Sequence, residues 1–174
     1  MNRHARRGFS LIELLVVIAI IAIMMAIAVP SFGSSVRASR ERTAIQRLTQ
    51  DFMWARGASA SNDASTLLAG TSGTPTLKVK VFSDCSWITT VNNVQDPKHT
   101  VDSTAIASIA PNVSCAVSGT TMPVTFQFTS QGFVSPTGKL TFTGTAYQSA
   151  NSQNQFVFQI LYSGAMFRAA SSAS

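Results

Sequence analysis

An apolar run near the start of the chain, preceded by a short basic segment, limits the fold more than any other feature. Residues 1–8 contain three arginines and no acid, and in the 21 residues of Phe9–Val29 that follow, the only charged side chain is Glu13. A helix of that length extends about 31 Å, which matches the roughly 30 Å hydrocarbon core of a bilayer. Phe9–Val29 is therefore predicted to be a transmembrane helix.

The order of the basic and apolar parts distinguishes this start from a secretory signal that is removed whole. Such a signal has a shorter apolar region, followed by small residues at its cleavage site. Here the plausible cleavage site, Gly8, comes before the apolar run. Cleavage there would leave the apolar helix on the mature protein.

The positive charge of the chain is concentrated in its first third. The formal net charge is +6, but the residues from Gly57 onward contain five basic and four acidic side chains, a net charge of +1. Nucleic-acid binding needs basic groups clustered on one face, so this distribution disfavours it for the later part of the chain. Charged residues make up 11% of the chain, against roughly 25% in ordinary soluble domains. Ser, Thr, Asn and Gln replace them, which suits a β-rich surface outside the cytoplasm.

The helix is predicted to continue beyond the apolar run as an amphipathic segment, residues 30–58. Pro30 would either kink this helix or break it locally, with the lost backbone hydrogen bonds satisfied nearby. Beyond it, apolar residues recur at spacings of three, four and three, namely Ile45, Leu48, Phe52 and Ala55. This spacing predicts one stripe packed on the body of the protein, with the arginines between on the opposite face.

Residues 59–174 are predicted to form a β-rich head. The Gly-, Ser- and Pro-containing stretch 57–75 indicates the helix end and a loop. From Thr76 onward, apolar and polar residues alternate in four segments: 77–81, 124–128, 140–143 and 155–162. Turn signals at 119, 132, 136–138, 144 and 164 separate them. Several short strands of this kind favour antiparallel sheets that each bury one face.

The sequence contains no recognisable catalytic or metal-binding constellation. His4 lies in the basic segment, and His99 lies in the stretch 96–99, which is predicted to be a polar turn. No nucleophile elbow or pair of acids accompanies them, and Gly70–Gly73 lacks the Lys-Ser/Thr that would complete a phosphate loop. Cys85 and Cys115 without clustered histidines make a poor zinc site. We therefore predict no enzymatic activity, no cofactor and no bound metal.

The segment Arg6–Leu15, which reads Arg-Arg-Gly-Phe-Ser-Leu-Ile-Glu-Leu-Leu, strongly resembles the prepilin leader of type IV pilins and type II secretion pseudopilins. In that family a prepilin peptidase cleaves after the glycine and methylates the new N-terminal phenylalanine. The resemblance implies cleavage between Gly8 and Phe9, with Phe9 becoming the N-methylated first residue.

The same resemblance implies roles for Glu13 and Pro30. A carboxylate inside an apolar span is costly and is by default a functional residue. The resemblance implies that Glu13 neutralises the Phe9 amine of a neighbouring subunit and so sets subunit register during assembly. The alternative is a carboxylate near the membrane interface that reaches the headgroups. Pro30 matches the pilin proline that marks a segment able to melt in the filament, where the arginine face would be available for subunit contacts.

The fold implied is α+β and pilin-like: a long N-terminal helix, transmembrane in its first half, followed by an antiparallel β-rich head. The chain would cross the bacterial inner membrane once, in contact with its lipid, with the head in the periplasm, and would enter a pilus or pseudopilus on assembly. Outside the cytoplasm, Cys85 and Cys115 are expected to form a disulfide. The alternative is two unrelated buried thiols.

Within the head, Val124–Gly132, followed by a Thr/Gly-rich hairpin and a final apolar strand, resembles the GspH/FimT branch of minor pilins and pseudopilins. The function implied is a structural subunit that primes or joins the filament, with the prepilin peptidase and other minor and major pilins or pseudopilins as partners. The alternative is a FimT-like subunit that binds DNA for natural transformation. Such members carry a C-terminal Gly-Arg-x-Arg motif, whereas Gly164–Arg168 here reads Gly-Ala-Met-Phe-Arg. Arg168 is the one candidate DNA ligand left, so DNA is the disfavoured partner.

Overall fold

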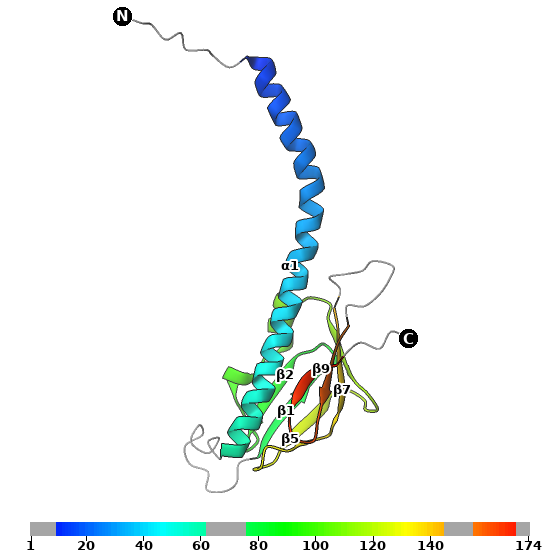
Figure 1. The fold of residues 1–174 in the computed structure, drawn as a ribbon. Helices are drawn as coiled ribbons and strands as arrows, with labels where there is room; N and C mark the ends of the chain where they lie inside the picture. Colours follow the sequence, from blue (N-terminus) through cyan, green and yellow to red (C-terminus); the bar gives the residue numbers. More distant parts are fainter. Residues whose placement is uncertain (1–9, 62–75, 145–154, 170–174) are drawn as a thin grey trace, which may run out of the picture. The chain divides into compact units, whose positions relative to one another are not determined.

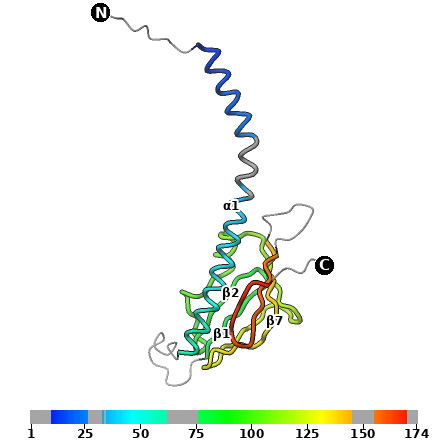
Figure 2. The backbone as a smooth tube through the Cα atoms, viewed as in Figure 1, coloured from blue at the N-terminus to red at the C-terminus, as the bar shows by residue number. Residues whose placement is uncertain are grey.

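The computed structural model of the chain describes residues 10–61, 76–144 and 155–169, without the side chains of residues 27–32 and 34. The chain forms two compact units, Met1–Val36 and Arg37–Ser174. One helix, α1 (Leu11–Ser61), contributes to both units (Figure 1, Figure 2). The β-strands all belong to the second unit. The predicted order of a long helix followed by a β-rich head is confirmed.

The first unit consists of the first half of α1. The carbonyl oxygen of Ser10 accepts hydrogen bonds from the backbone N–H groups of Glu13 and Leu14 at 3.0 and 3.3 Å, which defines the start of the helix. The described apolar side chains from Leu11 to Met25 are exposed. Residue 30 lies within the helix, so the backbone remains helical past this proline. Among the described residues, no helix combines the length and apolarity needed to cross a membrane.

The second half of α1 packs on the head through the stripe expected from the sequence. Ile45, Leu48, Phe52 and Ala55 are all buried, which confirms the predicted face. The Phe52 ring makes edge-to-face contacts with Phe126 and Phe128, with ring centroids 5.1 and 5.8 Å apart. These contacts join the helix to the first sheet.

The head contains two antiparallel sheets (Figure 1). The first has the order β3-β2-β1-β5-β6 and the second the order β4-β7-β8-β9. The strands of the first sheet are β1 (Leu77–Val81), β2 (Trp87–Val91), β3 (Val94–Gln95), β5 (Val124–Phe128) and β6 (Val134–Ser135). Those of the second are β4 (Ser114–Val117), β7 (Gly138–Thr143), β8 (Gln155–Ile160) and β9 (Met166–Ala169). A 3-10 helix, η1 (Pro97–His99), and a short helix, α3 (Ser103–Ile109), separate β3 from β4.

The alternation seen in the sequence sets which side chains enter the core. In β1 and β5 every second residue is buried, and their register pairs Val79 with Phe126 at the middle of the sheet. In the second sheet, β7 pairs with β8 so that Leu140 lies opposite Phe158 and Phe142 opposite Phe156. Buried side chains of α1 and of both sheets belong to one hydrophobic cluster. The four segments of alternation therefore correspond to β1, β5, β7 and β8.

Candidate functional site

The predicted assembly segment lies at the start of α1. Gly8 and Phe9 fall outside the described residues, whereas Glu13 is in the first turn of the helix. Its neighbours Leu11, Ile12 and Leu14 are 81%, 70% and 61% exposed. An apolar surface of this extent is typical of a contact with lipid or with another protein. Glu13 is therefore a carboxylate within an apolar surface that is expected to contact lipid or another protein. The roles of Glu13 and Pro30 in assembly stay predictions.

The two cysteines are joined by a disulfide between Cys85 and Cys115, with their Cα atoms 5.0 Å apart. The bond connects the β1–β2 turn of the first sheet to β4 of the second, and both cysteines are buried. A backbone hydrogen bond from Cys115 N–H to Ser83 O, 2.8 Å long, accompanies it. The disulfide therefore ties the two sheets together at one point.

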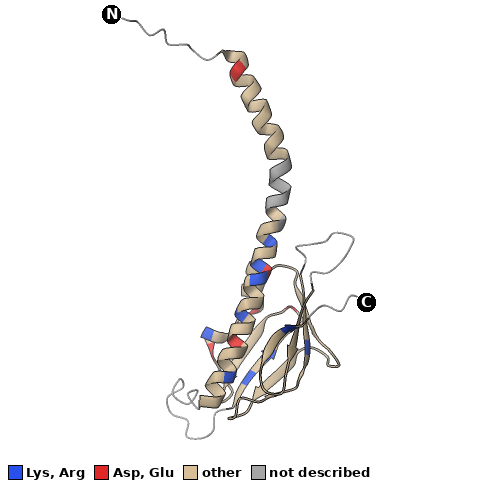
Figure 3. Ribbon diagram, viewed as in Figure 1, with Lys and Arg blue, Asp and Glu red and all other residues tan. Residues whose placement is uncertain are grey.

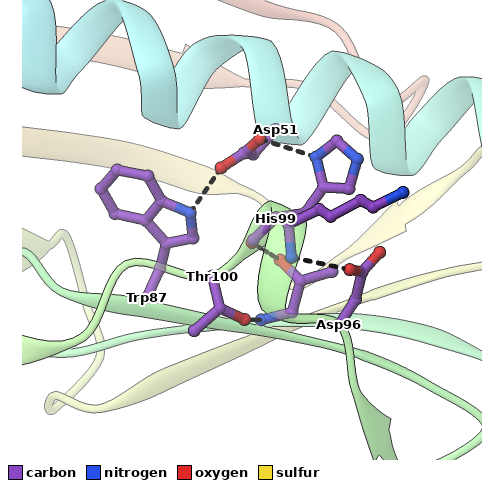
Figure 4. Close-up of polar contacts among 7 residues, drawn as sticks. Asp51, Trp87, Asp96, His99 and Thr100 are labelled. Carbon is purple, nitrogen blue, oxygen red and sulfur yellow. Dashed lines mark hydrogen bonds and ion pairs between the residues drawn. The ribbon is translucent and has the colours of Figure 1, made fainter.

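A polar contact between α1 and the head was missed by the sequence analysis (Figure 4). Trp87 donates its Nε1–H to Asp51 Oδ2 at 2.8 Å, and His99 Nδ1 lies 2.8 Å from Asp51 Oδ1. Because an ionised carboxylate only accepts, the Nδ1 carries the hydrogen of this second bond. The Trp54 ring stacks on the His99 ring, with centroids 3.6 Å apart and planes 9° apart. Asp51 is 6% exposed, so its two bonds replace the water that burial removes.

Local structure holds His99 in place for this contact. Asp96 caps η1 by accepting the Lys98 N–H at 2.9 Å. Thr89 donates its hydroxyl to the His99 carbonyl at 2.5 Å, and the Thr89 N–H donates to Thr100 Oγ1 at 3.1 Å. The predicted polar turn at 96–99 is thus a capped 3-10 turn fixed to β2. One sequence signal could have identified Asp51: it lies three residues after Leu48 and four before Ala55, on the apolar stripe.

The Asp51 contact is a structural connection between helix and sheet, in which both carboxylate oxygens are hydrogen-bonded. Each oxygen accepts from one side chain. Among the described residues, no serine, threonine or cysteine side chain is hydrogen-bonded to the His99 ring, since the Thr89 hydroxyl donates to the backbone carbonyl of His99. Groups of three or more metal-ligating side chains are likewise absent from the described residues.

We predict that Asp51→Ala destabilises the second unit, because it leaves the buried Trp87 N–H without an acceptor. The expected loss in unfolding free energy is about 2 kcal/mol. Asp51→Asn keeps one acceptor oxygen at similar volume and is expected to cost less. Urea unfolding of residues 37–174 measures both, with Gln50→Ala, an exposed neighbour on α1, as the matched control. A loss for Asp51→Ala no larger than that of the control would contradict this role.

Arg168, the candidate DNA ligand, lies on β9 at the edge of the second sheet. Its guanidinium carbon is 5.1 Å from the centroid of the Phe156 ring, a distance typical of a cation–π contact. The neighbouring residue Phe167 is 48% exposed. Arg168 thus has an intramolecular partner within the head, and no second arginine adjoins it in β9.

Comparison with known proteins gives one family finding. Residues 3–29 match the model described as the prokaryotic N-terminal methylation motif. The matched range includes Gly8, Phe9 and Glu13 and ends before the second half of α1. No curated protein and no solved structure was found to match the chain. The comparison therefore supports the N-terminal motif and leaves the predicted branch of the head untested.

Proposed function

We propose that this type IV pilin-like protein, which carries the N-terminal methylation motif ahead of a long helix and an antiparallel β-rich head, is a minor pilin or pseudopilin. It would prime or join the assembly of a pilus or of a type II secretion pseudopilus. The match of residues 3–29 to the methylation motif carries the proposal. The proposal that it is a minor subunit rests on the resemblance of Val124–Gly132 to the GspH/FimT branch. The role proposed is structural, without catalysis.

In this proposal each part of the chain has one task. Residues 1–8 are a leader that the prepilin peptidase removes, and residues 9–29 hold the chain in the inner membrane before assembly. Residues 30–58 continue the helix, and residues 59–174 form the periplasmic head. The disulfide between Cys85 and Cys115 supports an exported head, because cytosolic thiols are kept reduced.

Glu13 is proposed to pair with the methylated amine of Phe9 in a neighbouring subunit. The exposed apolar residues around it would be buried in the filament, and a carboxylate buried there needs a cationic partner. Pairing with the N-terminus of the next subunit would satisfy both charges and fix the stagger between helices. Pro30 would mark the part of α1 that loses regular structure in the filament.

The test compares Glu13→Ala with wild type in the native cells. Glu13→Ala is expected to be cleaved normally but to enter filaments at least about tenfold less. Tenfold corresponds to about 1.4 kcal/mol, and breaking a buried pair costs more, about 3–5 kcal/mol. The ratio of protein in sheared filaments to protein in membranes gives the readout. Glu13→Asp, which keeps the charge, is the matched control and should incorporate better than Glu13→Ala. Normal incorporation of Glu13→Ala would remove this role from Glu13.

A further inference from the structure

The outward face of the second half of α1 has a regular ridge of uncharged residues. They are exposed and follow one another at spacings of four, three, four, three and four: Ser39, Thr43, Gln46, Gln50, Met53 and Gly57. This spacing is that of the contact positions in a helix that packs along another helix. The ridge lies on the side of α1 opposite the buried stripe, because 3.6 residues make one turn. We call it the outer ridge.

Arginines border the outer ridge on both sides. Arg40 and Arg47, seven residues apart, follow ridge positions 39 and 46, and Arg42 and Arg56, fourteen residues apart, precede positions 43 and 57. All four are exposed. Relative to the ridge they occupy the two flanking positions whose charges select the partner in paired helices. Figure 3 marks the basic positions along this part of α1.

The acids of the same helix segment face inward. Glu41 is 3% and Asp51 6% exposed. Asp51 is bonded to Trp87 and His99, and the Glu41 carboxylate lies against Gly144, where an added Cβ would overlap it. Within the part of the chain that the structure describes, none of the four flanking arginines forms an ion pair. Arg56 also lies against the head, since Cβ atoms added at Gly132 and Gly164 would contact its side chain, but it is still exposed. Among the described residues of this helix segment, the exposed charges are therefore all basic.

This distribution argues against a second copy of the chain as the partner. Two outer ridges packed together would place arginines opposite arginines, and like charges across a contact disfavour association. The exposed flanks offer no carboxylate in exchange, because Glu41 and Asp51 point into their own head. A partner that suits the ridge has to bring the acids itself.

The shape of the surface favours a helix over a flat anionic surface. The arginines lie on two separate flanks with a neutral ridge between them. A helix would bind a lipid surface or a nucleic-acid duplex best if its charges lay on its outermost line. Among the described residues, none lies within 4 Å of a Cβ added at Gly57, so a partner helix can approach closely there. Met53, which is 57% exposed, supplies a flexible apolar contact on the same line.

We propose, on the basis of the function proposed above, that the outer ridge of α1 packs against a helix of a different subunit, and that this helix carries Asp or Glu at the positions flanking its own contact line. Arginine suits such pairs because its planar guanidinium can bind a carboxylate through two hydrogen bonds. The arginines would then select an acidic neighbour over another copy of this chain, which fits a subunit present at few positions in a filament.

The test uses the full chain in its native cells, with the photo-crosslinker benzoylphenylalanine placed at Gln46. The expected product joins residue 46 to a helical peptide of another pilin-like subunit in which acids flank the cross-linked position. Arg40→Gln/Arg47→Gln should lower the yield roughly fivefold, as expected for the loss of about 1 kcal/mol. Lys139→Gln, an exposed cation on β7, is the matched control and should leave the yield unchanged.

Several results would overturn the proposal. These are cross-linking to a second copy, to lipid or to DNA, a yield that the arginine substitutions leave unchanged, or no product from chains recovered in filaments. Filament recovery of the cross-linker-bearing chain and of wild type is measured in parallel. If wild type is absent from filaments, the function proposed above fails. If it is present while the cross-link contradicts the expected partner, only the assignment of the outer ridge fails.

Discussion

Chains with Gly8→Leu are expected to keep residues 1–8, whereas wild-type chains from the same cells begin at Phe9. The order of the basic segment and the apolar run favours a cleavage site ahead of the proposed membrane segment, and the resemblance to prepilins implies a peptidase that cleaves after this glycine. Wild type should also gain the mass of one methyl group at Phe9. Intact-mass spectrometry of the purified chain measures both changes, in cells with and without the prepilin peptidase.

Gly33→Leu is the matched control for this experiment. Gly33 lies in α1, is exposed, and has no described residue within 4 Å of an added Cβ, so the substitution should leave processing intact. Wild-type chains that remain unprocessed in both kinds of cell would contradict the prediction. The protein would then be a β-rich domain on a membrane anchor, and the assembly roles of Phe9 and Glu13 would be withdrawn.

The parts of the fold that were predicted from the sequence are those set by local periodicity. The buried stripe of α1 and the strands β1, β5, β7 and β8 each show their period within a few residues. β2 escaped because Thr89 occupies a buried position of its face. A buried threonine is tolerated there because its hydroxyl donates to the His99 carbonyl. His99 lies ten residues further along the chain, so the pattern within the strand does not reveal this partner. β4 and β9 each contain adjacent apolar residues, Cys-Ala-Val and Met-Phe, so neither shows an alternation.

The same distinction applies to the candidate sites. The processing motif is a continuous run of residues, so the sequence is sufficient to predict it. The Asp51 contact joins residues separated by 36 and 48 positions, and no local pattern links an acid on a helix to a histidine in a turn. The outer ridge is an intermediate case. The sequence predicts that the arginines face away from the stripe, but only the burial of Glu41 and Asp51 reveals that the face carries one sign of charge.

Removal of the disulfide is expected to cause the largest change in stability. Cys85→Ala/Cys115→Ala should lower the unfolding free energy of residues 37–174 by about 3.5–4 kcal/mol, the chain-entropy value for a loop of this size, since the two cysteines are 30 residues apart. Alanine keeps both buried positions apolar, so the loss reports mainly the missing cross-link. Urea unfolding with linear extrapolation measures it, and the slope should stay the same or rise if the native fold is retained, because the unfolded chain without the cross-link exposes more surface.

Reduction of the wild-type disulfide provides the control for the double substitution. Wild type with dithiothreitol should lose nearly as much stability as the double variant, and the double variant should not respond to the reductant. A loss below about 1 kcal/mol in both cases, within the range of an ordinary hydrogen bond, would contradict the prediction. The backbone hydrogen bond between Cys115 N–H and Ser83 O, together with the shared hydrophobic core, would then suffice to hold the two sheets together. Because the disulfide connects the β1–β2 turn to β4, a large loss would instead mean that the junction of the sheets depends on an oxidising compartment.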